Sequence, residues 1–461
     1  MLIRCEYAWL PDGVAADVLL DIRDGRFARV APGGGSAVPP SIDAGLSRGR
    51  LDENGPLDRP ASIEERGGEA AEWRPGITIP GFADAHSHAF HRALRGRTHA
   101  DRGDFWTWRT QMYTVARALD PDSYYRLARA VYGEMALSGI TTVGEFHYLH
   151  HGTGGTPYAD PNAMGHALIA AAQDAGLRIT LLDTLYLTAS VDGKPLEGPQ
   201  LRFGDGDALR WAERVDAIGD QPHLLVGAAI HSVRAVPTAQ LPTIAAWAGG
   251  RPLHAHVSEQ VAENEACLAE HGRTPTQVLA DFGAVHETFS AVHATHLTHA
   301  DIALLSGSYA CFCPTTERDL GDGIGPARTL ADAGARLTLG SDSHAVIDFF
   351  EEARALELNE RLATRRRGHF TPAELRAAAT GHTSLGWPDA GSIAVGMRAD
   401  LVTVSLDSVR TAGIEPEGVL FAAGAADVTH VVAGGREIVR DGRHREIDVP
   451  RELREAITCL F

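Results

Sequence analysis

Short apolar runs alternate with longer segments of helical periodicity through most of the chain. Runs such as ITTVGEF, RITLLDTLYL, PLHAHVSE and ARLTLGSDSH are separated by helix-like segments such as YYRLARAVYGEMALSG and TPTQVLADFGA. This alternation predicts repeated βα units and a parallel sheet. Seven or eight strands over roughly 310 residues favour a (β/α)8 TIM-like barrel, expected at residues 79–388. A doubly wound sheet is the alternative, although no GxGxxG motif follows a first strand.

The two ends of the chain have a different pattern, in which short apolar runs are separated by turn residues. Hairpin turns are indicated at Pro11–Gly13 and Arg23–Gly25. After about Trp387 the sequence GSIAVGMRADLVTVS again reads as short strands and turns. We therefore expect residues 1–78 and 389–461 to form one small β-sandwich domain beside the barrel. Within it, residues 32–75 are polar and rich in Gly and Pro, which predicts a loop-like insertion.

One helix start is well marked, because Thr371, Pro372 and Glu374 supply the N-cap, N1 and N3 residues of a capping box.

The composition limits the kinds of molecule that the protein is expected to bind. A formal net charge of −18 disfavours nucleic acid and anionic membrane surfaces, and an anionic substrate would need local cationic side chains. No apolar run approaches the ~20 residues of a membrane span, and the N-terminal residues lack the apolar core of a signal peptide. The five cysteines are scattered, so we expect no disulfide framework, buried strand positions for Cys311 and Cys313, and a cytoplasmic location.

Histidines and acidic residues stand at the ends of four apolar runs. His86 and His88 are two apart, so on a strand they point to the same face, whereas His91 has the wrong parity to join them. Later runs end in further candidates: His254, His256 and Glu259; His293, His296 and His299; Asp342 and His344. Catalytic residues of a parallel barrel collect at such strand ends. Imidazole and carboxylate ligands around an open position describe a catalytic zinc site; the alternative is a set of hydrogen-bonded core histidines.

The motifs HSH, HxxE, HATH and SDSH, with GSIAVGMRADL near the C-terminus, resemble the amidohydrolase superfamily in its mononuclear-zinc deaminase branch. Within that branch, HSHAFHRAL, FWTWRTQMY, TTVGEFHYLHH, HSVRAV, HAHVSEQ, VHATH and GSDSH are most similar to the deiminases of formimidoylglutamate in histidine degradation. These segments extend over about Gly81 to His344, and the flanking sheet segments extend the similarity to most of the chain.

The resemblance implies a role for each matching residue. It assigns one zinc ion to His86, His88, His256 and Asp342. It makes Glu259 the proton-shuttling carboxylate, His293 the second catalytic histidine and Asp342 the acceptor of a proton from the attacking water. The residues themselves do not separate His293 from His296. For the substrate, it implies carboxylate clamps at Arg109 and Arg234, with polar contacts from Tyr148 and His231.

His91 departs from the pattern, since many members of the family carry glutamine there. An imidazole N–H could donate the same hydrogen bond to a substrate carboxylate. An ordinary pKa near ~6.5 predicts that the effect of His91 on substrate affinity grows as the pH falls towards about 6.

The resemblance implies hydrolysis of N-formimidoyl-L-glutamate to N-formyl-L-glutamate and ammonia, on a small-molecule substrate with two carboxylates. The exchange at His91 leaves the aspartate homologue or another formimidoyl or guanidino acid open. Two other classes also stay open: a deaminase of a purine or other ring, such as guanine or an adenosine derivative, and a metal-dependent binding protein without turnover. The sequence does not fix the oligomeric state, and a homodimer is compatible with it.

Overall fold

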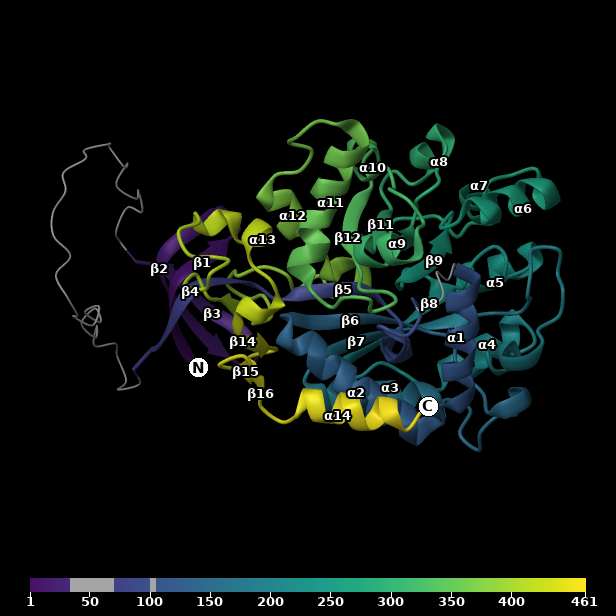
Figure 1. The fold of residues 1–461 in the computed structure, drawn as a ribbon, viewed down its shortest axis with the longest axis horizontal. Helices are drawn as coiled ribbons and strands as arrows, with labels where there is room; N and C mark the ends of the chain where they lie inside the picture. The colour runs from purple at the N-terminus through teal and green to yellow at the C-terminus, as the bar shows by residue number, and fades with distance from the viewer. Residues whose placement is uncertain (34–69, 100–104) are drawn as a thin grey trace.

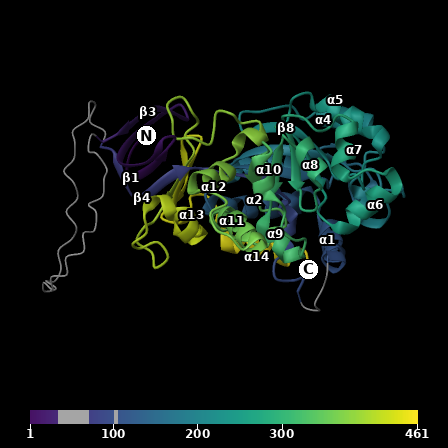
Figure 2. The ribbon, with the colours of Figure 1, turned by 90° about the horizontal axis from the view of Figure 1, so that it is seen from above.

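The protein contains two sheets that lie side by side. The computed structural model describes residues 1–33, 70–99 and 105–461. Within these residues the named strands form two eight-stranded sheets. Figure 1 shows the smaller one, in purple and yellow, next to the barrel, and Figure 2 shows the same arrangement from above. The predicted fold class, a TIM-like barrel with a small β domain built from both ends of the chain, is confirmed.

The barrel strands follow one another in sequence order, each parallel to the next. A parallel bridge between Ser87 and Asp342 brings the last strand back towards the first, so the barrel is nearly closed. This strict order excludes a doubly wound sheet, whose strand order reverses at its middle. The strands are β5 Phe82–Ser87, β6 Ile140–His147, β7 Arg178–Leu185, β8 Leu224–Ile230, β9 Leu253–Val257, β10 Phe289–His293, β11 Tyr309–Phe312 and β12 Arg336–Leu339.

The helices connect and cover these strands. Those before β10 are α1 Phe105–Ala118, α2 Pro121–Leu137, α3 Ala163–Ala175, α4 Ala208–Asp216, α5 Leu241–Ala248, α6 Val261–His271 and α7 Pro275–Asp281. Those after it are α8 His299–Leu304, α9 Pro314–Leu320, α10 Ala327–Asp332, α11 Phe349–Thr364, α12 Pro372–Ala379, α13 Val419–Ala422 and α14 Val449–Thr458. The capping box expected at Thr371 is confirmed at the start of α12. None of the helices in the described ranges has the length and apolar character needed to span a membrane.

The small sheet combines strands from both ends of the chain in one hydrogen-bonded series, β16-β15-β14-β13-β4-β1-β2-β3. Its strands are β1 Leu2–Leu10, β2 Gly13–Arg23, β3 Arg26–Pro32, β4 Glu72–Pro80, β13 Leu401–Val404, β14 Val428–Ala433, β15 Arg436–Arg440 and β16 Arg443–His444. The two ends meet where β4 pairs with β13. Residues 72–75, expected in the loop-like insertion, belong to β4, in which Glu72, Trp73 and Arg74 pair with β1. Residues 34–69 of that insertion lie outside the described residues.

A buried ion pair joins the barrel to the small sheet. Arg178, the first residue of β7, donates from Nη1 to Oδ1 of Asp400 at 3.0 Å, and its Nη2 also contacts this carboxylate. Asp400 directly precedes β13 and accepts a further hydrogen bond from the backbone N–H of Gly434 at 2.7 Å. Burial alone would raise the pKa of Asp400, but the Arg178 guanidinium outweighs it and holds the pKa below its usual value.

We expect Asp400→Asn to lower the free energy of unfolding by about 3 kcal/mol at neutral pH, because a buried guanidinium loses its charged partner. The folded-state pKa of Asp400 is lowered, so the stabilisation is complete above the unfolded pKa of about 3.9 and is lost as the pH falls through the lower folded value. Thermal unfolding at pH 7 and below pH 4 measures this, with Asp21→Asn, which removes the partner of the exposed Arg23, as the matched control. Equal losses of stability in the two variants would contradict the role given to the buried ion pair.

Candidate functional site

The residues expected to hold or use a metal meet at the C-terminal edge of the barrel. They are His86 in β5, His88 just after β5, His256 in β9, His293 at the end of β10 and Asp342, which follows β12. All five are buried. They converge because the C-terminal ends of parallel strands in a closed barrel surround one point.

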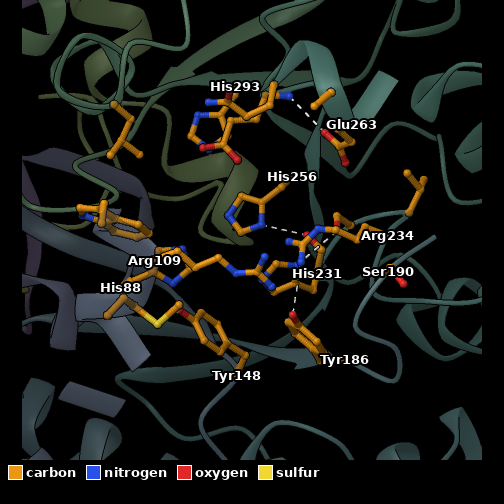
Figure 3. A pocket seen from close by; sticks show the side chains of 18 of the residues that line it. His88, Arg109, Tyr148, Tyr186, Ser190, His231, Arg234, His256, Glu263 and His293 are labelled. Carbon is orange, nitrogen blue, oxygen red and sulfur yellow. Dashed lines mark hydrogen bonds and ion pairs between the residues drawn. The ribbon is translucent and has the colours of Figure 1, made fainter. Parts of the chain in front are cut away.

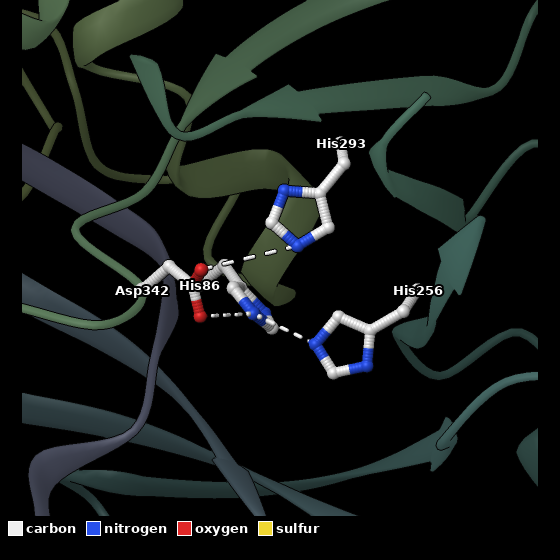
Figure 4. A group of neighbouring side chains, drawn as sticks. All are labelled: His86, His256, His293 and Asp342. Atoms are coloured by element: carbon white, nitrogen blue, oxygen red, sulfur yellow. Dashed lines mark hydrogen bonds and ion pairs between the residues drawn. The ribbon is translucent and has the colours of Figure 1, made fainter. Parts of the chain in front are cut away.

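The Asp342 carboxylate is the centre of this group. Its Oδ1 lies 3.3 Å from Nε2 of His86 and 3.4 Å from Nε2 of His88. The Nε2 atoms of His86 and His256 lie 3.1 Å apart (Figure 4). Zinc ligands at ~2.0–2.1 Å in a tetrahedral array stand about 3.3 Å from one another. These three pairs of donor atoms therefore have about the spacing that a bound zinc ion would require.

Two of these imidazoles are oriented by hydrogen bonds on their far side. Nδ1 of His88 lies 2.9 Å from the carbonyl oxygen of Phe146, and Nδ1 of His256 lies 2.8 Å from that of His231. Because a carbonyl only accepts, each Nδ1 must carry the proton, which leaves a lone pair on Nε2; this atom lies beside Asp342 in His88 and beside Nε2 of His86 in His256. This is the usual second contact of a metal-binding histidine.

The backbone around the centre adopts a conformation that side chains rarely take. Left-handed φ values at non-glycine residues cost free energy and cluster at functional sites. Here they occur at Ser258, His293, Ala294, Asp342 and His344. These turns at the ends of β9, β10 and β12 aim the histidine and aspartate side chains inward.

The structure separates the two histidines of HATH. Nε2 of His293 lies 3.9 Å from Oδ2 of Asp342 and 3.9 Å from Oε1 of Glu259. Nε2 of His296 instead lies 2.8 Å from the carbonyl oxygen of Asp322. His293 is therefore the member of the pair that faces the centre. It also joins His86, His256 and Asp342 in a group whose ligand atoms all lie within 4.8 Å, so it is a second candidate for the fourth ligand beside His88.

His293 is surrounded by carboxylates. Its Nδ1 lies 3.5 Å from Oε1 of Glu317, on the opposite side of the ring from Glu259 and Asp342. Burial alone would lower the pKa of His293, but these three carboxylates outweigh it and raise the pKa well above its usual value. Burial raises the pKa of Glu259. A cationic imidazole beside a carboxyl group that can carry a proton is suited to proton transfer.

A cavity of about 300 Å³ opens beside the centre (Figure 3). It is lined by residues of every predicted substrate-binding segment: His91, Arg109, Tyr148, His231 and Arg234. Its wall also contains His88, His256, Glu259, His293 and Asp342. The predicted catalytic and substrate-binding residues thus share one pocket, with His86 buried next to it.

Two arginines line the pocket. Arg109 extends from α1 and donates from Nε to the hydroxyl of Tyr113 at 2.8 Å. Arg234 follows β8 and donates from Nη1 to the hydroxyl of Tyr186 at 3.4 Å. Burial alone would raise the pKa of Tyr186, but the two guanidinium groups together lower it. Both arginines therefore act on the same space, where an anionic group of a ligand would be stabilised.

His91 lies in the pocket wall next to His88. Its Nε2 is 2.9 Å from the Tyr148 hydroxyl, and its ring contacts the Trp108 ring edge-on at 5.0 Å. Burial lowers the pKa of His91 to about 3. The sequence-based expectation that His91 gains charge near pH 6 is therefore wrong. It assumed the pKa of an imidazole in water.

We expect His91→Gln to retain the bound metal and most of kcat, and to change KM by the same factor from pH 6 to pH 8. The reason is that a neutral imidazole and an amide both offer one N–H donor here. Metal content and steady-state kinetics over that pH range are the measurements, and His166→Gln at the half-exposed ion pair with Asp160 is the control. Loss of metal in His91→Gln would show that His91 is a ligand.

Several residues of the site were not identified from the sequence. Tyr186 and Glu263 line the pocket, while Glu317 and Asp322 lie behind it in the segment that follows β11. Burial and the neighbouring Glu259 raise the pKa of Asp322 to about 9. Glu317 and Asp322 belong to ERDLGD, an acidic stretch that reads as an ordinary solvated turn, so only the fold reveals their burial.

Comparisons with known proteins agree with this architecture. The sequence model of the amidohydrolase family matches residues 77–438. The formimidoylglutamate deiminase of Pseudomonas aeruginosa is 36% identical over 96% of this chain and 95% of that protein. A 5-methylthioadenosine/S-adenosylhomocysteine deaminase of Natronomonas pharaonis is 26% identical over 82% of this chain and 85% of its own. The crystal structure of an amidohydrolase from Brucella melitensis superimposes with a TM-score of 0.84 at 30% identity, covering 100% of this chain and 99% of that one. The chain therefore belongs to the amidohydrolase family.

Proposed function

We propose that this protein is a metal-dependent formimidoylglutamate deiminase, which hydrolyses N-formimidoyl-L-glutamate to N-formyl-L-glutamate and ammonia. The observation that carries the proposal is the shared pocket, which the histidines and aspartate of the centre line together with Arg109 and Arg234. The identity to the Pseudomonas aeruginosa deiminase over nearly the full length of both chains supports the same C–N bond hydrolysis.

The proposed zinc ligands are His86, His88, His256 and Asp342. His88 is preferred to His293 because its Nε2 approaches the same Asp342 oxygen as His86, at 3.4 Å. A zinc ion held there would supply Lewis acidity and lower the pKa of a water molecule towards ~7. The five cysteines are free thiols, which favours a reducing compartment, so the cytoplasm is the proposed location.

The remaining residues move protons and stabilise charge. Asp342 takes up a proton from the attacking water at Oδ2, the oxygen that faces His293. His293 donates from Nε2 as negative charge develops next to the tetrahedral carbon. Glu259 delivers a proton from Oε1 to the leaving nitrogen, which then departs as ammonia.

Substrate recognition in this proposal rests on the two arginines. Each guanidinium can grip a carboxylate with two parallel hydrogen bonds, which a lysine cannot reproduce. Tyr148, His231 and His91 add neutral polar contacts between the arginines and the centre. Two carboxylates and a formimidoyl group then bind along a single cavity.

A ring deaminase is the second candidate, because the aromatic residues Trp108, Tyr148, Tyr186 and Phe203 also line the pocket. Ammonia release distinguishes the candidates when N-formimidoyl-L-glutamate, its aspartate homologue, guanine and an adenosine derivative are tested side by side. Turnover of formimidoylglutamate above the others supports the proposal. Turnover of a ring compound without turnover of formimidoylglutamate rejects it.

We expect elemental analysis of the active protein to give about one zinc per chain, since the proposed ligands form a single four-donor set. Chelation should remove activity, and one equivalent of zinc should restore it. Two metals per chain at full activity would contradict the mononuclear site.

A further inference from the structure

Tyr186 lies in the pocket wall beside Arg234, and the proposed reaction gives it no role. It directly follows β7, and its side chain is buried. Its ring lies 5.3 Å from the Phe203 ring and 4.4 Å from the His231 ring, measured between centroids. Figure 3 shows its hydroxyl directed towards Arg234. Packing against two other rings therefore fixes the direction of this hydroxyl group.

The Tyr186 hydroxyl oxygen receives hydrogen bonds from two donors. Nε2 of Gln200 lies 3.1 Å from it, and Nη1 of Arg234 lies 3.4 Å from it. An amide NH2 group and a guanidinium only donate, so the oxygen accepts from both and its two lone pairs are occupied. Within the described part of the chain, the hydroxyl proton has no acceptor of its own. This proton is therefore free to be donated to a ligand in the pocket.

Gln200 reaches Tyr186 from outside the pocket, because it does not line the cavity. It lies in the short 3-10 helix η3 Gly198–Arg202 and is buried. This helix is anchored by Arg202, which donates to the carbonyl oxygen of His151 at 2.7 Å and to that of Leu119 at 2.7 Å. The Gln200 amide thus belongs to a segment that is fixed to two other parts of the barrel edge.

Arg234 and Tyr186 together offer a ligand only donors. The guanidinium has no lone pair to share, and the lone pairs of the Tyr186 oxygen are already occupied. A carboxylate accepts at both oxygens and matches such a surface, whereas the NH2 group of a carboxamide would face other donors. A bound carboxylate also keeps the phenol protonated, because a neighbouring negative charge raises the pKa of a tyrosine.

We propose that Tyr186 donates a hydrogen bond to the substrate carboxylate that Arg234 binds, and that Gln200 positions Tyr186 for this contact. The pair then excludes a substrate that carries a carboxamide at this place. The inference rests on the proposed function, in which the substrate carries two carboxylates. It adds a neutral, directional donor to the charged one, and it separates formimidoylglutamate from one of its two monoamides.

The wild-type protein, Tyr186→Phe, Gln200→Glu and the double variant test the proposal. The carboxylate introduced by Gln200→Glu accepts where the amide donates, so the Tyr186 proton turns to it and away from the ligand. Ammonia release gives kcat and KM for N-formimidoyl-L-glutamate. Calorimetry on the metal-loaded proteins gives dissociation constants for N-formyl-L-glutamate and for its monoamides, N-formyl-L-glutamine and N-formyl-L-isoglutamine.

Tyr186→Phe and Gln200→Glu should each raise KM and the dissociation constant of N-formyl-L-glutamate about tenfold, since a hydrogen bond to a charged group is lost. The kcat should change less than about threefold, because this contact is made equally in the ground state and the transition state. Adding Gln200→Glu to Tyr186→Phe should cause little further loss, because no hydroxyl remains to be redirected.

The wild-type protein should bind one of the two monoamides at least about tenfold more weakly than N-formyl-L-glutamate, and Tyr186→Phe should reduce that preference about fivefold. Tyr125→Phe is the matched control, because the Tyr125 hydroxyl donates to Asp174 in an exposed hydrogen bond. Its kinetic constants and its preference should equal those of the wild type.

An unchanged dissociation constant in Tyr186→Phe overturns the proposal, and so does a wild-type protein that binds both monoamides as tightly as N-formyl-L-glutamate. A full further loss on adding Gln200→Glu to Tyr186→Phe overturns the role of Gln200, because the introduced charge then acts without the hydroxyl. If Gln200→Glu does not fold, Gln200→Leu replaces it and should raise KM about threefold only where Tyr186 is present; an equal rise without Tyr186 counts against the proposal. Failure of the proposed function is seen separately, as absence of ammonia from N-formimidoyl-L-glutamate with the wild-type protein, whatever the dissociation constants are.

Discussion

Asp342→Asn is expected to lower kcat by about 10³-fold or more and to lower the metal content, because one carboxylate serves both as ligand and as proton acceptor. The fold should survive. The side-chain contacts of Asp342 are with His86, His88 and His293, whereas its backbone contacts do not depend on the carboxylate. Those backbone contacts are its N–H to the carbonyl of His86 at 2.9 Å and its carbonyl to the N–H of His88 at 3.3 Å.

The measurements are kcat, metal content and circular dichroism of the purified variant. Asp120→Asn is the matched control: Asp120 caps the start of α2 by accepting at Oδ1 from the N–H group of Ser123, and asparagine caps a helix equally well. Activity near wild type in Asp342→Asn, with the metal retained, would reject the assignment of the centre.

Arg109→Met and Arg234→Met should each lower kcat/KM for formimidoylglutamate by about 30-fold or more, equivalent to about 2 kcal/mol of transition-state stabilisation. Methionine keeps much of the apolar stem but removes the planar donor group, so one substrate carboxylate enters a partly desolvated pocket without a charged partner. Arg234→Met would also remove the hydrogen bond that Arg234 donates to the Tyr186 hydroxyl.

A formimidoyl compound that lacks the side-chain carboxylate distinguishes the roles of the two arginines. Its turnover should respond to only one of the two arginine substitutions, because each arginine is assigned to one carboxylate. Arg251→Met is the control, since Arg251 is an exposed residue paired with Asp220. If the compound is used as well as formimidoylglutamate, the assignment of the two arginines is wrong.

The barrel could be predicted from the sequence because its evidence is local and repeated. Each strand is an apolar run, and the ends of parallel strands must meet, so His86, His256 and Asp342 could be grouped without coordinates. The helix start at Thr371 depends on three neighbouring residues only and was predicted correctly.

Features that depend on contacts between segments far apart in the sequence could not be predicted from local sequence patterns. The choice between His293 and His296 depends on which ring the turn after β10 aims inward, and both fit the motif equally. The lowered pKa of His91 arises from burial beneath Trp108 and Tyr148, which lie on other elements. The burial of Asp322 could not be predicted for the same reason, because it depends on segments that follow three different strands.

The pairing of β4 with β13 has a consequence for how the chain folds. Thr78 and Thr403 meet across these two strands, with their hydroxyl oxygens 3.0 Å apart and 325 positions between them in the sequence. During synthesis at about 5–20 residues per second, β1 to β4 therefore emerge many seconds before their partner exists. The edge of β4 stays unpaired throughout that interval, which makes it a site for association with other chains. Contacts of such long range also slow folding. We therefore expect refolding in vitro to be slow and to require a low protein concentration.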